Sequence, residues 1–215
     1  ELVAGAMFFA LLVGFPLGII AALKRGSAVD RAAMGFVSAG LAVPSFWFGL
    51  TLVLVFSVKL KWLPASGYVP LREDPVENLK RVFLPSLTLG VYLSATLIRF
   101  LRADMIEVMA ADYVRTARAK GLRESVVVVK HALKNALLPT LTVLGLQVGL
   151  VFGGAVLVEI VFSWPGMGRY AVQGINQFDY NAVMGTTLVI AFIYVIVNLV
   201  VDVLYVVVDP RISYA

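Results

Sequence analysis

The sequence has no cysteine, a single histidine and few charged residues, which make up 14% of its 215 positions. Without cysteine, neither a disulfide framework nor a thiolate metal site can form. The lone histidine, His131, excludes a metal centre built from several imidazoles. So few charges cannot cover the surface of a water-soluble chain of this length, and the mean hydropathy of +0.93 is typical of a membrane protein.

Five apolar stretches carry no charged residue. A helix needs roughly 20 apolar residues to cross the hydrocarbon core, and every stretch but the third reaches that length. The third is bounded by Arg81 and Arg99, whose long side chains can extend to the two interfaces. Because the stretches are continuously apolar rather than alternating, we predict an all-α fold, a polytopic membrane helix bundle with five transmembrane helices. The five stretches are Leu2–Leu23, Ala32–Val58, Val82–Ile98, Asn135–Val158 and Tyr180–Val201.

The Lys and Arg residues divide unequally between the two sides of these spans, with 12 on one side and 6 on the other. The richer side is predicted to be cytoplasmic, because positively charged loops remain there. The net charge of +5 therefore reflects topology and does not indicate binding to nucleic acid. This topology places Glu1 outside, and without a basic leader we expect a further N-terminal helix before Leu2. The 12 residues are Lys24, Arg25, Arg31, Arg99, Arg102, Arg115, Arg118, Lys120, Arg123, Lys130, Lys134 and Arg211.

The long cytoplasmic loop has the pattern of two helices. Asp112 is a candidate N-cap for a helix at Tyr113–Lys120, which Gly121 is expected to end. A second helix is predicted to start near Glu124 and to run into the membrane, with Pro139 at the start of the next span.

The first of these helices combines small residues, Ala117 and Ala119, with flanking cations. This pattern suits a helix that docks into a groove of a partner protein. It equally suits an interfacial helix held on anionic lipid by its Arg and Lys side chains. The physical pattern alone leaves both interpretations open. In the second helix the run Val126–Val129 favours a strand, but no neighbouring segment could pair with it, so we expect a helix.

Two segments of this loop resemble the cytoplasmic signature of ATP-binding-cassette importer permeases, in the dipeptide, oligopeptide and nickel branch. They are Asp112–Leu122 (DYVRTARAKGL) and Lys130–Pro139 (KHALKNALLP). The broad family opens this signature with Glu-Ala-Ala, whereas Arg115-Thr116-Ala117 stands here, so the acidic residue is absent. Further segments similar to the same branch follow in order along the chain, at Pro16–Ser27, Val43–Gly67, Glu159–Gly168 and Asp209–Arg211.

The resemblance implies that residues 1–215 form a transmembrane permease domain and that residues 105–134 form its cytoplasmic coupling loop. It implies a second homologous permease subunit, two cytoplasmic ATPase subunits that bind ATP and Mg, and an external substrate-binding protein. The sequence has no Gly-x-x-x-x-Gly-Lys-Ser/Thr motif, so we expect neither a cofactor nor an enzymatic activity in this chain. The implied substrates are dipeptides or oligopeptides first, with nickel chelates, opines and some glycosides left open. The implied location is the plasma (inner) membrane of a bacterium or archaeon. The residues implied to dock the ATPase are Asp112, Tyr113, Val114, Arg115, Thr116, Ala117, Arg118, Ala119, Lys120, Gly121 and Leu122.

Polar residues inside the spans are candidates for the translocation path, because intramembrane polar groups often line one. Such side chains equally bond their own backbone or a neighbouring helix. Glu159, at the outer end of its span, either faces the path or holds the turn at Trp164–Gly166. The path candidates are Ser45, Ser94, Gln147 and Asn198.

A secondary transporter or channel without an ATPase is the main alternative function. Such proteins usually place ionisable groups in the middle of the membrane for ion coupling, and these spans nearly lack them. An intramembrane enzyme would need a catalytic set at depth, which one loop histidine and no cysteine do not provide. A simple membrane anchor would not explain the patterned loop.

Overall fold

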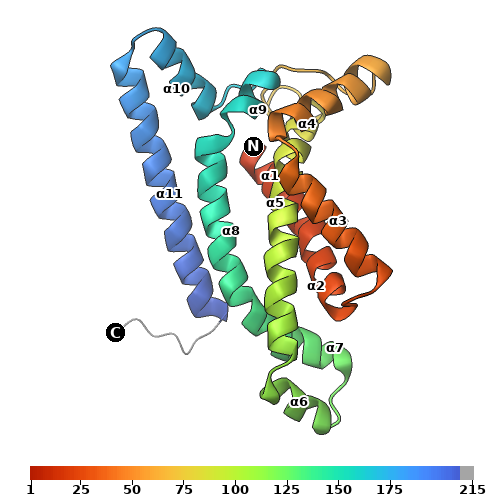
Figure 1. The fold of residues 1–215 in the computed structure, drawn as a ribbon. Helices are drawn as coiled ribbons and strands as arrows, with labels where there is room; N and C mark the ends of the chain where they lie inside the picture. The colour runs from red at the N-terminus through yellow and green to blue at the C-terminus, as the bar shows by residue number, and fades with distance from the viewer. Residues whose placement is uncertain (209–215) are drawn as a thin grey trace.

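The computed structural model describes residues 1–208, and of residues 150, 153, 154 and 208 it describes only the backbone. Within this part of the chain all regular elements are helices, so the predicted all-α class is confirmed (Figure 1). Three of them, marked η, are wide π-helical turns that continue a neighbouring α-helix. The elements are α1 Leu2–Phe9, η1 Ala10–Gly14, α2 Phe15–Leu23, α3 Ala28–Ala42, α4 Ser45–Leu52, η2 Val53–Lys59, α5 Pro75–Met109, α6 Asp112–Ala119, α7 Glu124–Val126, η3 Val127–Leu133, α8 Lys134–Gly154, α9 Val156–Val161, α10 Met167–Asn176 and α11 Tyr180–Val208.

Among the described residues, four helical stretches are long and apolar enough to cross a bilayer, and α3 with α4–η2 forms a fifth, bent candidate. This number agrees with the predicted polytopic bundle. The Asp209–Arg211 segment lies outside the described residues. The four stretches are Leu2–Leu23, Pro75–Met109, Glu124–Gly149 and Tyr180–Val207.

The second predicted span, Ala32–Val58, is not one continuous helix. The chain bends by 102° between α3 and α4. Pro44 lacks the N–H that would continue the helix, and Val43 before it takes an extended conformation, with φ −82° and ψ 124°. The sequence prediction read the apolar run correctly but gave this proline too little weight.

Two other predicted spans have different bounds in the structure. The third, predicted at Val82–Ile98, is the much longer α5. The fourth, predicted to reach Val158, stops at the end of α8, and a separate helix α9 follows. Adjacent glycines at positions 153 and 154 favour a helix end here, because glycine is a poor helix former.

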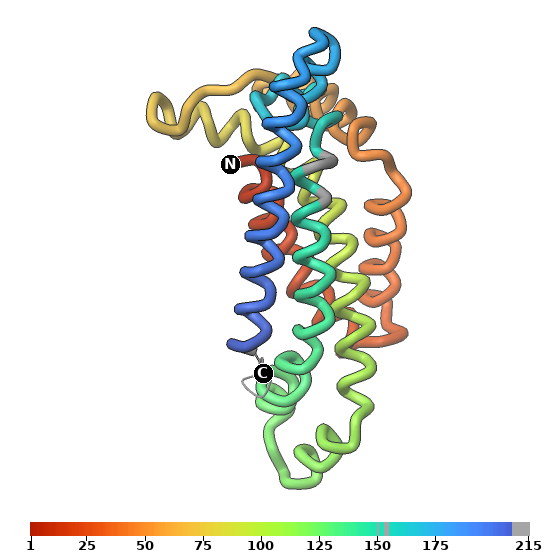
Figure 2. Tube along the Cα trace, turned by 90° about the vertical axis from the view of Figure 1, so that its left-hand side faces the viewer, coloured from red at the N-terminus to blue at the C-terminus, as the bar shows by residue number. Residues whose placement is uncertain are grey.

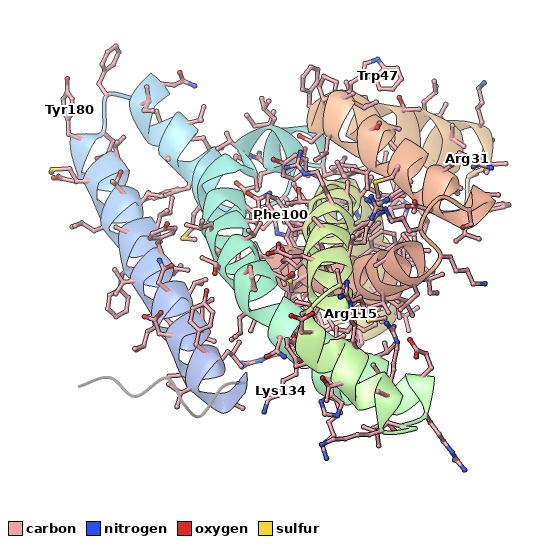
Figure 3. All side chains as sticks on the ribbon, turned by 60° about the horizontal axis from the view of Figure 1, so that its bottom comes forward. Arg31, Trp47, Phe100, Arg115, Lys134 and Tyr180 are labelled. Carbon is pink, nitrogen blue, oxygen red and sulfur yellow. The ribbon has the colours of Figure 1, made fainter. Side chains whose placement is uncertain are left out.

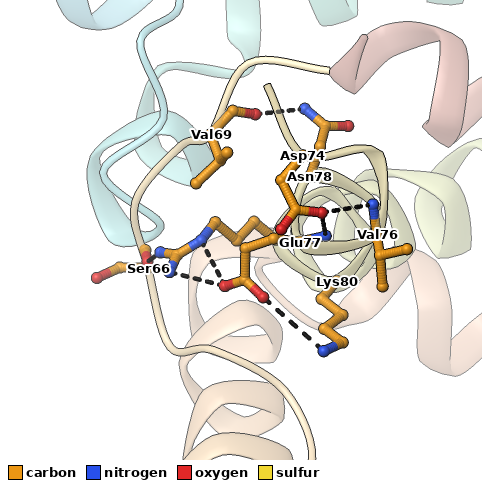
Figure 4. Close-up of polar contacts among 8 residues, drawn as sticks. Ser66, Val69, Asp74, Val76, Glu77, Asn78 and Lys80 are labelled. Atoms are coloured by element: carbon orange, nitrogen blue, oxygen red, sulfur yellow. Dashed lines mark hydrogen bonds and ion pairs between the residues drawn. The ribbon is translucent and has the colours of Figure 1, made fainter. Parts of the chain in front are cut away.

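The start of α5 is fixed by polar contacts at the outer end of the bundle (Figure 4). The Asp74 carboxylate accepts hydrogen bonds from the backbone N–H groups of Val76 and Glu77, both at 3.0 Å, which satisfies two free donors of the first turn. Asn78 donates to the Val69 carbonyl at 2.7 Å, and Arg81 donates to the Ser66 carbonyl at 2.7 Å. These bonds tie the outer loop to the helix.

α5 is the centre of the bundle and contacts α1, α2, α3 and α8 (Figure 2). Its buried face includes Leu84, Leu93 and Leu101, each no more than 1% exposed. By contrast α11 lies alongside α8 at the edge, and its apolar side chains are mostly exposed on the isolated chain. A helix with so many exposed apolar side chains is expected to face lipid or another subunit.

The two ends of the bundle separate the charged loops as the charge count predicts. α6 and α7 lie at one end, whereas α4, α9 and α10 lie at the other (Figure 1). Figure 3 brings the first end forward, where Arg115 and Lys134 project, far from Trp47 and Tyr180. The first end is the one predicted to be cytoplasmic.

The close packing of α1 on α5 depends on Gly90. A Cβ at this position would lie 2.9 Å from the Phe9 Cβ and 3.1 Å from the Ala6 carbonyl oxygen, so Gly90→Ala forces the two helices apart. We expect this variant to lose about 1–3 kcal/mol of stability. Gly35→Ala is the matched control, because a Cβ there meets no atom within 4 Å and should add about 0.5–1 kcal/mol. Thermal unfolding in detergent measures both, and equal midpoints would contradict the packing argument.

Candidate functional site

The candidate docking helix α6 forms almost where the sequence predicts it, with one correction at its start. Asp112 is the first helical residue rather than the N-cap; Ala111 holds that position without a side-chain cap. Gly121 ends the helix as predicted, with a positive φ of 76° that favours glycine. The second predicted helix also forms, beginning at Glu124 and continuing through the valine run into α8.

One face of α6 is buried within the chain itself. Val114 and Ala117, which are 0% and 5% exposed, pack with Val127 of η3 and with Val108 and Met109 at the end of α5. Their side chains therefore fill the inside of the loop and do not form an open docking surface. This corrects the simplest interpretation, in which both contact a partner.

The remaining predicted docking residues are exposed and form what we call the α6 outer face. Three of them, Arg115, Arg118 and Lys120, are cationic, and two, Tyr113 and Leu122, are apolar and more than 40% exposed. A partner would thus meet both apolar side chains and positive charge on this face. The α6 outer face consists of Asp112, Tyr113, Arg115, Thr116, Arg118, Ala119, Lys120, Gly121 and Leu122.

Two polar contacts fix the orientation of α6. Arg118 donates from Nε and Nη2 to the two carboxylate oxygens of Glu124, at 3.1 and 2.7 Å. Asn135 Nδ2, at the start of α8, donates to the Tyr113 hydroxyl at 3.0 Å. Sequence reasoning missed both, because the partners are 6 and 22 residues apart and no helix spacing links them.

The path candidates do not come together in this structure. Ser94 is fully buried and donates to the Gly90 carbonyl, while Asn198 donates to the backbone of its own helix. Gln147 donates to Thr96 Oγ1 at 3.2 Å, which joins α8 to α5. Ser45 lines a small apolar cavity of about 240 Å³ between α3, α4 and α5. Ser94 and Asn198 therefore have structural bonds, and a path role for all four stays a prediction.

A larger cleft of about 720 Å³ opens between α1, α8 and α11. Its walls are apolar, formed by residues such as Met7, Val148 and Val200, and Glu159 and Trp164 line it as well. The cleft has the size of a small-molecule site, but its walls offer few polar groups to orient a ligand.

Glu159 holds the turn before α10, which confirms the structural alternative for this residue. Its buried carboxylate accepts a hydrogen bond from the Arg169 backbone N–H at 2.7 Å, in the first turn of α10. Its own carbonyl accepts from the Trp164 N–H at 2.8 Å. Gly166 is required beside it, because a Cβ there would overlap the carboxylate.

Burial raises the pKa of Glu159, and the hydrogen bonds from the backbone of Arg169 and Gly168 only partly offset this. The unfolded chain therefore ionises at lower pH than the folded one. Stability is thus lost as pH rises from the ordinary glutamate range through the raised folded value. Glu159→Gln keeps an acceptor oxygen and removes the charge, so its unfolding midpoint should gain on the wild type as pH rises from 4 to 8. Glu73→Gln, in the exposed outer loop, is the control; an equal gain in both variants would contradict this prediction.

An ion pair at the inner end was also missed by sequence reasoning. Arg102 of α5 donates from Nε and Nη2 to the two carboxylate oxygens of Asp30 of α3, at 2.6 and 2.8 Å. The Asp30 carboxylate, which is 6% exposed, also accepts from the Gly26 N–H at 2.8 Å. The pair clamps the turn between α2 and α3 onto α5. Its partners lie 72 residues apart in the chain. The sequence therefore shows only an acidic residue, Asp30, beside an apolar run and does not show which cation it pairs with.

Residues 14–214 match the sequence pattern of a known protein family. That family is described as the inner membrane component of binding-protein-dependent transport systems. The chain belongs to this family. It is thus a multi-pass membrane protein and the permease subunit of a binding-protein-dependent ATP-binding-cassette importer. The resemblance carried by the loop residues is confirmed at the level of this family.

Named relatives of this permease support the same assignment. It is 42% identical to the dipeptide transport system permease protein DppB of Escherichia coli K12, over 100% of this chain and 70% of that protein. It is 42% identical to the glutathione transport system permease protein GsiC of Pectobacterium atrosepticum, over 97% of this chain and 66% of that one. A structure of the MetNI methionine transporter in inward-facing conformations shares the fold, with a TM-score of 0.70 at 16% identity, covering 97% of this chain and 93% of that one.

Proposed function

We propose that this permease forms, with a second homologous permease, the translocation path for dipeptides or oligopeptides in the plasma membrane of a bacterium or archaeon. An external binding protein delivers the peptide, and two cytoplasmic ATPase subunits bind ATP and Mg and drive the transport. The substrate class rests on the dipeptide and glutathione permeases that the chain resembles.

The observation that carries the ATPase docking is the α6 outer face. Its cationic and apolar residues project at one end of the bundle, on a helix that its buried face and two polar contacts hold in place. When a partner displaces a helix that is held in this way, the helices packed against it move as well. A loosely attached loop would move alone. Closure of the ATPase pair on ATP would then move α6 and switch the bundle between inward-open and outward-open states.

Uptake into proteoliposomes tests this proposal. The full-length permease is reconstituted with its second permease, its ATPase subunits and its binding protein, and uptake of a labelled dipeptide is followed. We expect uptake only when ATP is present on the side of the membrane where the ATPase subunits lie and the binding protein is present on the other side. Uptake driven by a proton or sodium gradient without ATP would instead support a secondary transporter or channel.

A further inference from the structure

The contacts of α6 are distributed unequally between the two helices that flank it in sequence. It follows α5 after a two-residue turn, 110–111, and Val108 and Met109 join the buried cluster under it. Its side-chain bonds to Glu124 and Asn135 lead forward into α7 and α8, whereas toward α5 it has only a long contact of 3.9 Å, between Arg118 Nη2 and Met109 Sδ, among the described residues. α7, η3 and α8 form one helical stretch. The bonds from α6 to Glu124 and Asn135 therefore both attach α6 to the helix that continues as α8.

α8 in turn contacts the rest of the bundle on two sides. Toward α5, Thr140 Oγ1 donates to the Asp104 carboxylate at 2.8 Å, one turn and a half beyond Asn135 along the helix. Toward α11, Thr142 contacts the Tyr205 hydroxyl, and Gly149 lies so close to Tyr194 that a Cβ would overlap its ring. A displacement of α8 therefore reaches both the central helix and the edge helix.

We propose that Glu124 and Asn135 are positioning residues that couple α6 to α8, so that movement of the docked ATPase enters the bundle through α8. This inference rests on the proposed function. Neither residue belongs to the α6 outer face, so each acts through its partner, Arg118 or Tyr113. When both side chains are replaced, the buried cluster of Val114, Ala117 and Val127 still holds α6 against η3. The packing of that cluster is then the remaining link to the α8 stretch, so a movement of α6 displaces α8 less.

This arrangement predicts weaker coupling with assembly intact. Each contact is partly exposed and worth about a two- to fivefold change in an equilibrium. The variants Glu124→Gln and Asn135→Ala should therefore retain bound ATPase and continue to hydrolyse ATP. The amount of peptide taken up for each ATP hydrolysed should fall by about two- to fivefold in each variant and further in the double variant. A purely stabilising role would lower uptake and hydrolysis together.

The test uses the complete transporter in proteoliposomes and measures dipeptide uptake and phosphate release in the same sample. Ser125→Ala and Lys134→Ala are matched controls, because both are exposed neighbours of the two positioning residues. Arg118→Glu alone should lower the ratio of uptake to hydrolysis. Adding Glu124→Arg should restore part of that ratio, because the ion pair forms again with its two charges exchanged.

Three results would overturn the inference. An unchanged uptake-to-hydrolysis ratio in the double variant, with ATPase still bound, would show that α6 transmits motion by another route. Loss of the ATPase from the Glu124→Gln or Asn135→Ala complex would show that these residues serve docking itself. Absence of the ATPase from the wild-type complex would overturn the proposed function, and this inference with it.

Discussion

Replacing Arg102 by alanine is expected to lower the midpoint of thermal unfolding in detergent by about 6–12 °C, corresponding to about 3 kcal/mol. The substitution removes both guanidinium bonds to Asp30 and leaves a nearly buried carboxylate without its cation. Of the hydrogen bonds to that carboxylate, only the one from the Gly26 N–H would remain. The unfolding midpoint of Arg102→Lys should lie between those of the wild type and Arg102→Ala, because a lysine keeps the charge but cannot make the paired guanidinium contact.

The chain offers an exposed ion pair as the control for this prediction. Arg115 and Asp112 of α6 lie 3.4 Å apart, with side chains that are 72% and 96% exposed. Arg115→Ala should leave the unfolding midpoint unchanged within error, because solvent screens such pairs. Equal losses in Arg102→Ala and Arg115→Ala would contradict the clamp between α3 and α5.

The second large effect is expected from Ala117→Asp. This residue faces Val114 and Val127, so the new carboxylate would be buried in an apolar cluster at a cost of about 2 kcal/mol or more. α6 should then detach from η3, and trypsin cleavage in the loop should accelerate about tenfold or more, as the open loop becomes more populated. Limited proteolysis of the permease in detergent measures this rate.

Ala119→Asp is the matched control, because it makes the same change two residues along the same helix at an exposed position. Both variants place an aspartate beside Arg118, so any direct effect on cleavage after that residue is shared. Similar cleavage of both variants and the wild type would show that the inner face of α6 is not packed.

Much of the fold could be predicted because apolar continuity and charge placement are local properties of a sequence. The runs that became α1–α2, α8 and α11 follow directly from helix length and the bilayer thickness. The bend at Pro44 was missed because an apolar run shows that a segment is in the membrane but not that it is straight. Pro44 itself is the signal for the bend, because a proline removes a backbone donor and disfavours the helical conformation in the residue before it.

The candidate site was only partly predictable. The position of α6 and its end at Gly121 follow from capping chemistry and from the resemblance to a family signature. Which face of α6 points outward could not be predicted, because Val114 and Ala117 are buried by a segment that the chain reaches only after a turn. The contacts of Asn135 with Tyr113 and of Arg102 with Asp30 depend on tertiary packing for the same reason.

Site-specific cross-linking is the most direct test that the α6 outer face docks the ATPase. These 215 residues contain no cysteine, so within them a single introduced cysteine is the one site that a benzophenone maleimide labels. The permease is labelled before it is assembled with its partner subunits. In the complete transporter, Thr116→Cys on the α6 outer face is expected to form an adduct with an ATPase subunit. Asn181→Cys, exposed at the opposite end, should form none. No ATPase adduct at Thr116, or an equal adduct from Asn181, would contradict the account.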